Sequence, residues 1–591
     1  MHPNSRIHQN GPRPFLLLLA NLLPLAMAER LPAQCGTTVV GATSNATWTL
    51  TGSPYCVNTT IAVAGLTIQP GVEVRLAPGA SLQVTSWLRA LGTREQPIVF
   101  RAQNLASGRW GGIEFQGPVP PNNASLLENC VITEAGNSGV RILDNDQVTL
   151  QGCAIRGNTS ALDGGGLRVV LSSGSVGCFD CEIEGNGAAG NGGGVHATAS
   201  GGASLALQEC RIVGNSCTGG PGVHDGGGVW AAGDISIMAC VVSGNSIMSS
   251  GCGGARAVGG GIYGSLGNLT VMNSKIVDNR CEVAVICTIG GNFANGGGIF
   301  AASAVGSLTL RGSLVCCNSV FASGYGSSFA GPGVQTAAAN CSIENCTIAR
   351  NSNEGVRITA GSTTLTNCIV FANTGPSLVG TATVNYSCIQ GGFVGGTGNI
   401  PFNPQFVDSG CQPEDFALSQ TSPCIDAGDP VAMHNDACRP PGQGTARNDM
   451  GALGGSGNCG FTGPSVMICG AQHYGLGKQL PNAMTLDWAF TSSLPPYPGV
   501  LTIANGFPNS PTLLLLGFQA VDTPLSGISL LVDPASASVL ATTLDAAGSW
   551  AAPLGLQIPF LVGWPLFLQA ISLPASGSVR ASNGMRIATC H

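Results

Sequence analysis

Charged residues are scarce in this chain: Asp, Glu, Lys and Arg make up 9% of its 591 residues, against about 25% in typical proteins. Lysine occurs only at Lys275 and Lys478, and the formal net charge is −7. Such a chain has no basic surface for the phosphates of nucleic acid. Because 44% of the residues are hydrophobic, the shortage of charge does not indicate disorder. We therefore expect a folded protein without a nucleic-acid partner.

Long hydrophobic runs are also missing. The apolar run from Phe15 to Leu25 is shorter than the ~20 residues that a membrane-spanning helix needs. Arg residues precede this run, and Ala26–Ala28 follows it with the small-x-small pattern of a cleavage site. These features predict a signal peptide over residues 1–28. We expect a secreted or cell-surface protein without an integral membrane span.

Zinc-type patterns of Cys and His are absent, although the chain has 24 Cys. Cys178 and Cys181 have the Cys-x-x-Cys spacing, but no second pair completes a tetrahedral metal site. All the Cys follow the predicted cleavage site, so they meet an oxidising compartment in which disulfides form. Sequence does not fix disulfide connectivity, and our working pairs are Cys35–Cys56, Cys217–Cys252 and Cys281–Cys287.

Helical periodicity is missing from the middle of the chain, where two short motifs alternate instead. The first is a Gly triplet followed by an aliphatic residue, and the second is Cys-x-aliphatic-x-x-Asn, in which Ser274 and Ser313 replace Cys. Segments between the motifs alternate apolar and polar residues, as Ser204–Leu207 does, which is typical of strands. The triplets begin at Gly164, Gly192, Gly226, Gly259 and Gly296.

The Asn of the second motif recurs every 22 to 39 residues, and fixed repeats of about 20–50 residues indicate a solenoid. Coils of short parallel strands would lie about 4.8 Å apart, so that each motif position becomes a ladder of like residues. Asn side chains can hydrogen-bond to one another along such a ladder. The sequence predicts an all-β fold, a right-handed parallel β-helix over residues 29–400. The expected structural ladder is Asn158, Asn186, Asn215, Asn245, Asn279, Asn318, Asn351 and Asn373.

The same register makes two further predictions. Arg156 should neighbour Glu184, and Glu182 should neighbour Arg211, so that opposite charges meet on adjacent strands. The Cys of the motif should point inward as small buried hydrophobic residues and not as catalytic thiols. They are Cys130, Cys153, Cys181, Cys210 and Cys240.

Length variation is concentrated at one corner of the predicted coil. The distance from each Asn to the next Gly triplet varies between 6 and 17 residues, and insertions on one side of a solenoid often mark its binding face. The alternative is that these loops only cover the core. The loops are Ser216–Asp225, Ser246–Val258, Arg280–Asn295 and Ser319–Ala330. Their candidate binding residues are His224, Arg256, Arg280, Glu282, Phe293, Phe321, Tyr325 and Phe329.

The two alternating motifs, over roughly residues 129–390, resemble the repeats of polymorphic outer membrane proteins and related β-helix proteins. Ser422–Gly428 and Asp449–Ala452 resemble the choice-of-anchor type segment that follows many extracellular β-helices, here residues 401–455. We expect this segment to cap the last coil and protect its open strand edge. Its acids could bind Ca²⁺ or cap turns; they are Asp408, Asp426, Asp429 and Asp449.

A linker over residues 456–469 separates a last domain, residues 470–591. Short apolar runs broken by Gly, Pro and Asn, such as Thr512–Leu516, predict a small β-sandwich. The stretches Leu544–Trp550 and Ser582–Met585 resemble a C-terminal module of planctomycete-type exported proteins.

No catalytic motif stands out along the chain. Pectin-lyase-like solenoids include pectate lyases, polygalacturonases and epimerases, so the fold alone decides nothing about activity. A lyase of that type needs an Arg or Lys base beside clustered acids. Arg168, Arg211 and Arg256 have no repeated acids beside them in the sequence. We predict a non-catalytic protein without a metal or cofactor site, which serves adhesion, glycan binding or envelope structure, with extracellular polysaccharide or cell-envelope components as its partners. The alternative is a polysaccharide lyase acting on uronate polymers.

Overall fold

The structure is a computed structural model. It describes residues 35–460, apart from 119–122, 220–221, 251–254, 285–291, 324–327, 408–415 and 440, and separate strands between 470 and 588. The predicted signal peptide, Cys252, Cys287, Tyr325 and Asp408 lie outside the described residues. Among the residues that are described, none of the helices has the length and apolar character needed to cross a membrane.

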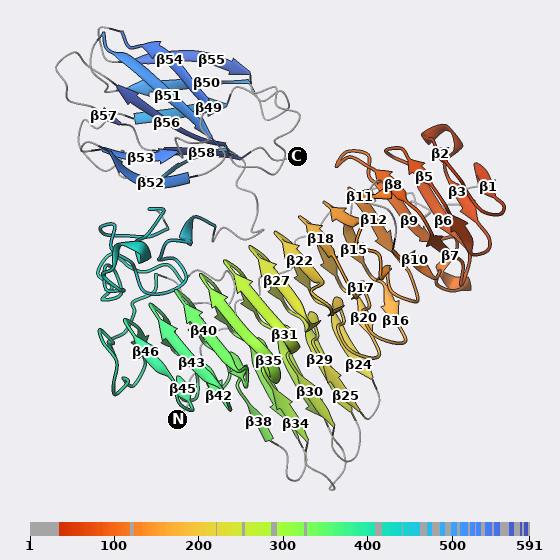
Figure 1. The fold of residues 1–591 in the computed structure, drawn as a ribbon, viewed down its shortest axis with the longest axis horizontal. Coiled ribbons are helices and arrows are strands. Elements are labelled where there is room, and N and C mark those ends of the chain that lie inside the picture. The colour runs from red at the N-terminus through yellow and green to blue at the C-terminus, as the bar shows by residue number, and fades with distance from the viewer. Residues whose placement is uncertain are drawn as a thin grey trace, which may run out of the picture.

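The chain from Cys35 to Ile400 winds through stacked coils of parallel strands, as predicted (Figure 1). Each coil contributes one strand to each of three parallel sheets around an apolar interior. Sheets 1 and 2 share the long strands β31 and β35, whereas sheet 3 is separate. Leu, Ile, Val and Cys side chains fill the interior because alternate residues of every strand point inward.

Sheet 1 consists of β4 (Ile61–Val63), β7 (Ser81–Val84), β10 (Gly112–Gln116), β13 (Val140–Leu143), β17 (Leu167–Leu171), β21 (Val195–Ala199), β26 (Val229–Ala232), β31 (Ile262–Met272), β35 (Ile299–Arg311), β39 (Val334–Thr336), β42 (Val356–Ile358) and β45 (Leu378–Val379). Sheet 2 consists of β2 (Ala46–Trp48), β5 (Leu66–Ile68), β8 (Leu88–Leu91), β11 (Ser125–Glu128), β14 (Val148–Gln151), β18 (Ser175–Phe179), β22 (Ser204–Gln208), β27 (Asp234–Met238), β31, β35, β40 (Asn340–Glu344), β43 (Ser362–Thr366) and β46 (Thr383–Asn385).

Sheet 3 consists of β1 (Thr37–Val39), β3 (Tyr55–Val57), β6 (Glu73–Leu76), β9 (Ile98–Ala102), β12 (Cys130–Thr133), β15 (Ala154–Arg156), β19 (Glu182–Glu184), β23 (Arg211–Val213), β28 (Val241–Ser243), β32 (Lys275–Val277), β36 (Leu314–Cys316), β41 (Thr347–Ala349), β44 (Ile369–Phe371) and β47 (Cys388–Ile389). The short 3₁₀ turns are η1 (Leu50–Gly52), η2 (Leu105–Ser107), η4 (Ala432–His434) and η5 (Asn458–Gly460).

The predicted register is confirmed on sheet 3. Arg156 pairs with Glu184 on the next strand, and Glu182 pairs with Arg211. The Arg211 Nε atom lies 4.0 Å from the Glu182 Oε1 atom. The motif Cys are buried with free thiols, as expected of small core residues. Cys35 and Cys56 form the predicted disulfide, and a second disulfide, which sequence reasoning missed, joins Cys438 to Cys459.

The asparagine ladder is continuous. Each amide nitrogen donates to the side-chain oxygen of the next Asn along the axis, from Asn158 to Asn373, over 2.9 to 3.1 Å. The same nitrogen also donates to a carbonyl of the preceding coil, as Asn215 does to Ile183 at 2.8 Å. The Asn215 side-chain oxygen, for example, accepts from both the backbone N–H and the side-chain amide of Asn186. The ladder therefore satisfies these buried polar groups and holds successive coils in register.

The Gly triplets turn the chain into sheet 1 at a corner that lies beside the asparagine ladder. Gly192, the first of its triplet, has a φ of +65°, which L-residues rarely adopt. A Cβ atom on Gly194 would lie 2.7 Å from the Gly228 carbonyl oxygen and 2.9 Å from the Asn215 Nδ2 atom. Neighbouring coils thus approach too closely at this corner for any side chain.

The inserted segments form strands and not the loops that we expected. They make two further parallel sheets, which together we call the side ridge (Figure 1). Successive segments leave the ladder at equivalent positions, so their backbones can pair with one another. Sheet 4 consists of β16 (Thr159–Ser160), β20 (Gly187–Ala188), β24 (Ser216–Gly219), β29 (Ser246–Ser250), β33 (Arg280–Ala284) and β37 (Ser319–Ala322). Sheet 5 consists of β25 (Val223–Asp225), β30 (Arg256–Val258), β34 (Phe293–Asn295) and β38 (Ser328–Ala330).

The side ridge has its own small apolar core, which corrects two of the expected disulfides. Cys217 and Cys281 carry free, buried thiols in this core, packed with Ile247, Ala257 and Ala294. Because both side chains point inward between sheets 4 and 5, they are core residues here. The pairs Cys217–Cys252 and Cys281–Cys287 were therefore wrong.

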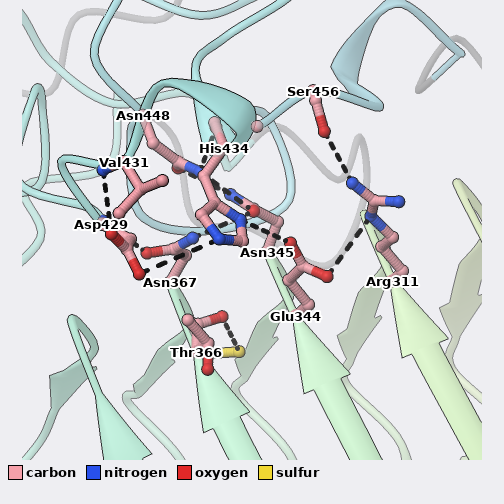
Figure 2. Close-up of polar contacts among 12 residues, drawn as sticks. Arg311, Glu344, Asn345, Thr366, Asn367, Asp429, Val431, His434, Asn448 and Ser456 are labelled. Carbon is pink, nitrogen blue, oxygen red and sulfur yellow. Dashed lines mark hydrogen bonds and ion pairs between the residues drawn. The ribbon is translucent and has the colours of Figure 1, made fainter.

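The segment after Ile400 packs along the side of the last coils, whereas we expected a cap on their end. Phe416 and Ala452 pack on Leu314, and Leu418 and Met450 pack on Ile369, both on the outward face of sheet 3. Polar contacts at the sheet 2 side complete the interface (Figure 2). The Asn345 Nδ2 atom donates to the Asn448 Oδ1 atom at 2.9 Å, the Asp429 N–H donates to Asn367, and His434 faces Glu344.

The remaining strands pair antiparallel in three sheets, in contrast to the parallel coils. This difference agrees with a separate C-terminal domain, and the sandwich packing of its sheets stays a prediction. The strands are β48 (Gly470–Tyr474), β49 (Thr485–Phe490), β50 (Pro498–Ala504), β51 (Pro511–Gly517), β52 (Ala520–Leu525), β53 (Ile528–Val532), β54 (Ser538–Thr543), β55 (Trp550–Gly555), β56 (Leu566–Ser572), β57 (Arg580–Ala581) and β58 (Gly584–Ala588).

Candidate functional site

A file of polar and aromatic side chains runs along the outward face of sheet 1, one residue from each coil. In the coils with a Gly triplet, it is the second residue after the triplet. These positions pair directly from strand to strand, so the side chains are neighbours along the axis. We call this set the front file: Glu114, Arg141, Arg168, His196, Trp230, Tyr263, Phe300, Gln335 and Arg357.

The middle of the front file is a continuous stack of rings. The ring centroids of His196 and Trp230 lie 4.3 Å apart, those of Trp230 and Tyr263 lie 6.3 Å apart, and those of Tyr263 and Phe300 lie 5.5 Å apart. The planes are inclined by 2° to 22°, so the rings cover each other's faces. Trp230 and Phe300 are partly exposed. His196 and Tyr263 are buried, so the stack forms a strip parallel to the axis that is exposed at Trp230 and Phe300.

Sheet 5 of the side ridge lies beside this strip, because each of its strands leads into sheet 1 through a Gly triplet or, after β38, through Gly331-Pro332-Gly333. Arg256 of β30 donates from its Nη2 atom to the Tyr263 hydroxyl at 3.2 Å, and its guanidinium lies over the Tyr263 ring. Phe293 is its register partner on β34 and is exposed. Aromatic and cationic groups thus line two adjoining files.

Carboxylates accompany the cations of this surface. Asp225 of β25 lies 3.5 Å from Arg256, and Asp163 lies 3.8 Å from the His196 Nε2 atom. Burial raises the pKa of Asp225 to about 6, although Arg256 opposes that effect. Burial lowers the pKa of His196 to about 4. At neutral pH the His196 ring is therefore neutral and Asp225 is mostly ionised.

Several buried polar atoms on this surface have no hydrogen-bond partner among the described residues. They are the His196 Nδ1, Asp225 Oδ1 and Gln335 Oε1 atoms. The Nε atoms of Arg168 and Arg357 are buried donors that likewise have no partner within the described parts of the chain. Buried polar groups are normally satisfied. Five of these unpartnered atoms thus lie on the front file or on sheet 5.

The structure distributes the predicted binding residues over three faces and does not bring them together. Arg256 and Phe293 lie on the sheet 5 face beside the front file. Arg280, Glu282 and Phe321 lie on the outer face of sheet 4, where Arg280 and Glu282 form an ion pair of 2.8 Å. His224 is buried inside the side ridge. Phe329 stands at the equivalent register position on β38, where its side chain is exposed.

Sequence reasoning missed the front file except for Arg168, which was considered only as a lyase base. The sequence contained a signal for this file, because the second residue after each Gly triplet belongs to it. These residues are Arg168, His196, Trp230, Tyr263 and Phe300. Their chemical types change from coil to coil, so no repeated letter marks the position. The fixed distance from the triplet was the usable clue.

The acids proposed for Ca²⁺ hold turns of the segment after Ile400. Asp426 accepts from the Thr445 backbone and hydroxyl, Asp429 accepts from Val431 N–H, and Asp449 accepts from Asp426 N–H. In the part of the chain that the structure describes, no three His, Cys, Asp or Glu side chains converge in a metal-holding arrangement. The hydrogen bonds of the described acids are those of turn caps.

Comparison with known proteins agrees with this fold. Residues 93–247 match the sequence model of the family described as "Right handed beta helix region". No curated protein sequence matches the chain. Among solved structures, the chain is similar to the crystal structure of pectate lyase Pel9A with a TM-score of 0.34 and 14% identity, over 65% of this chain and 88% of that one. The parallel pairing of the coils and the family match over residues 93–247 together identify a right-handed parallel β-helix.

Proposed function

We propose that this chain is an exported, non-catalytic protein of the cell surface or extracellular space, which binds polysaccharide along the front file. The observation that carries the proposal is the ring stack with unpartnered buried acceptors beside it. Sugar hydroxyls are hydrogen-bond donors, and sugar rings also present apolar C–H surfaces. The partly exposed rings of Trp230 and Phe300 offer apolar contact area to the C–H surfaces, and the acceptors beside them suit the hydroxyls.

The repeat supports a polymer as the ligand. Coils lie about 4.8 Å apart, a rise comparable with the length of one sugar ring. His196, Trp230, Tyr263 and Phe300 occupy four successive coils, and Gln335 continues the file on the next coil. A glycan chain lying along the axis would meet a similar environment at each step. Export is supported by the predicted signal peptide and by the Cys35–Cys56 disulfide.

Affinity electrophoresis of the full chain in gels that contain neutral or acidic polysaccharides would test the proposal. We expect retention by at least one polymer, and we expect Trp230→Ala to weaken it by about tenfold, the typical effect of losing an aromatic contact. Phe321→Ala is the matched control, because this exposed aromatic lies on the outer face of sheet 4. Retention that is unchanged in the Trp230 variant, or no retention at all, would contradict the proposal.

The second candidate is a polysaccharide lyase, and one contact favours it. Asp225, Arg256 and Tyr263 meet at the edge of the strip, and Asp225 has a pKa of about 6. A carboxyl with such a pKa could exchange protons near neutral pH. Incubation of the chain with polygalacturonate or alginate, with ultraviolet detection of unsaturated ends, separates the two candidates. Product formation that Asp225→Asn abolishes would replace the binding function with catalysis.

A further inference from the structure

The cations of the front file and of sheet 5 have carboxylate partners, with one exception. Arg141 pairs with Glu114, and Arg357 pairs with Glu354. Arg256 lies beside Asp225, as described above. Arg168 makes neither an ion pair nor a hydrogen bond with any residue that the structure describes, and its Nε atom is buried. A charged guanidinium that faces the candidate binding surface is thus left without a counterion from the fold.

The position of Arg168 is fixed by its neighbours in the file. On β17 it pairs with Arg141 on one side and with His196 on the other. His196 begins the ring stack, so Arg168 lies at one end of the aromatic strip. The cation and the strip therefore belong to one continuous surface.

Asp163 is the acid nearest to Arg168 in the sequence, but its two oxygens face other residues. Its Oδ1 atom accepts from the Asn191 N–H at 2.8 Å, and its Oδ2 atom lies 3.8 Å from the His196 Nε2 atom. The His196 Nδ1 atom is buried and has no hydrogen-bond partner among the described residues. Arg168 is thus left as a cation beside a neutral ring, with no acid of its own.

We infer that Arg168 binds an anionic group of the glycan, a carboxylate or a sulfate. The inference rests on the proposed function and names its ligand class, an acidic polysaccharide. A guanidinium matches both groups, because its planar fork donates two parallel hydrogen bonds to their oxygens. The neighbouring ring stack would then hold the following sugars. No bond is made or broken in this interaction.

The test compares Arg168→Gln with the native full chain, using polygalacturonate, dextran sulfate and neutral dextran as probes in titration calorimetry. Because hydrogen bonds to charged groups are strong, we expect the substitution to weaken binding of one or both polyanions at least tenfold. Arg168→Lys should retain part of the affinity, since it keeps the charge but not the fork. Arg211→Gln is the matched control, because it removes an Arg from the outward face of sheet 3, two coils along.

The outcomes separate the inference from the proposed function. A preference for polygalacturonate assigns a carboxylate to Arg168, and a preference for dextran sulfate assigns a sulfate. Polyanion affinity that is equal in the native chain and in Arg168→Gln overturns the inference and leaves polysaccharide binding intact. Equal weakening by Arg211→Gln also overturns it, because binding would then follow overall charge. No binding to any probe overturns both. Thermal melting of each variant checks that the fold is kept.

Discussion

At the residue scale, an internal asparagine of the ladder is bound on four sides. The Asn215 side chain donates to Ile183 and Asn245, and it accepts from the backbone and side chain of Asn186. Asn215→Ala removes these bonds and leaves buried donors and acceptors unpaired, each costing roughly 1–3 kcal/mol. We expect the free energy of unfolding to fall by several kcal/mol, as measured by denaturant titration.

The comparison variant is Asn340→Ala, which removes the same type of side chain from an exposed position of β40. Exposed substitutions usually change stability by less than about 0.5 kcal/mol. If the two variants lose similar stability, the ladder does not have the role that its geometry indicates. Hydrogen exchange of Ile183 and Asn186 amides would show whether the damage begins at the neighbouring coils.

At the scale of the element, the Gly corner allows the coils to approach. Gly194→Ala would place a methyl group within 3 Å of the Gly228 carbonyl and of the Asn215 amide, so backbone must shift. We expect a loss of about 1–3 kcal/mol, the usual cost of an overpacked site, in thermal or denaturant unfolding. Gly187→Ala is the control, because its Cβ would have no neighbour closer than 3.8 Å. Equal effects would contradict the steric explanation.

The side ridge shows what sequence could and could not predict about elements. The corner of the coil that carries the insertions was predicted correctly, from the variable number of residues between each ladder Asn and the next Gly triplet. Their strand structure was missed, because segments such as Ser246–Val258 have few alternating residues and their pairing depends on the neighbouring coil. The disulfides expected for Cys217 and Cys281 failed for the same reason, since only a second layer of strands makes these positions interior.

At the scale of the whole molecule, the segment after Ile400 should loosen in alkali. Burial and the neighbouring charge of Asp449 raise the pKa of Asp436 to about 8, and burial raises that of Asp449 to about 6. The fold favours the protonated acids, so this stability is complete below about pH 4 and is lost as pH rises through these values. Hydrogen exchange of residues 424–458 should therefore be faster, after correction for intrinsic rates, at pH 8 than at pH 6.

Asp436→Asn should remove most of that difference. The amide cannot ionise, and its oxygen can still accept from the backbone N–H groups of Asp449 and Gly455, which now donate to Asp436. Each unit of pKa shift corresponds to about 1.4 kcal/mol, so the variant should be more stable than the native chain at pH 8. Asp234→Asn, at an exposed carboxylate of β27, should leave the pH dependence unchanged. A difference that persists in Asp436→Asn would contradict the assignment.

The sequence also carries a signal for the lateral docking of this segment on sheet 3. Outward positions of sheet 3 are charged in the middle coils, as at Glu182 and Arg211, but apolar in later coils, as at Leu314, Ile369 and Phe371. That change marks the face that Phe416 and Met450 cover. The solenoid itself was predictable because its contacts repeat at fixed positions, whereas docking of a non-repeating segment depends on single side chains.

The asparagine ladder also makes the length of this molecule adjustable. Every link joins a coil only to the coil before it and the coil after it, so a duplicated or deleted coil would meet the same partners at both junctions. Gain or loss of one repeat in the gene would therefore extend or shorten the front file by one step without redesign of the remainder. Variation in repeat number among related chains would then adjust the length of the binding surface that we propose.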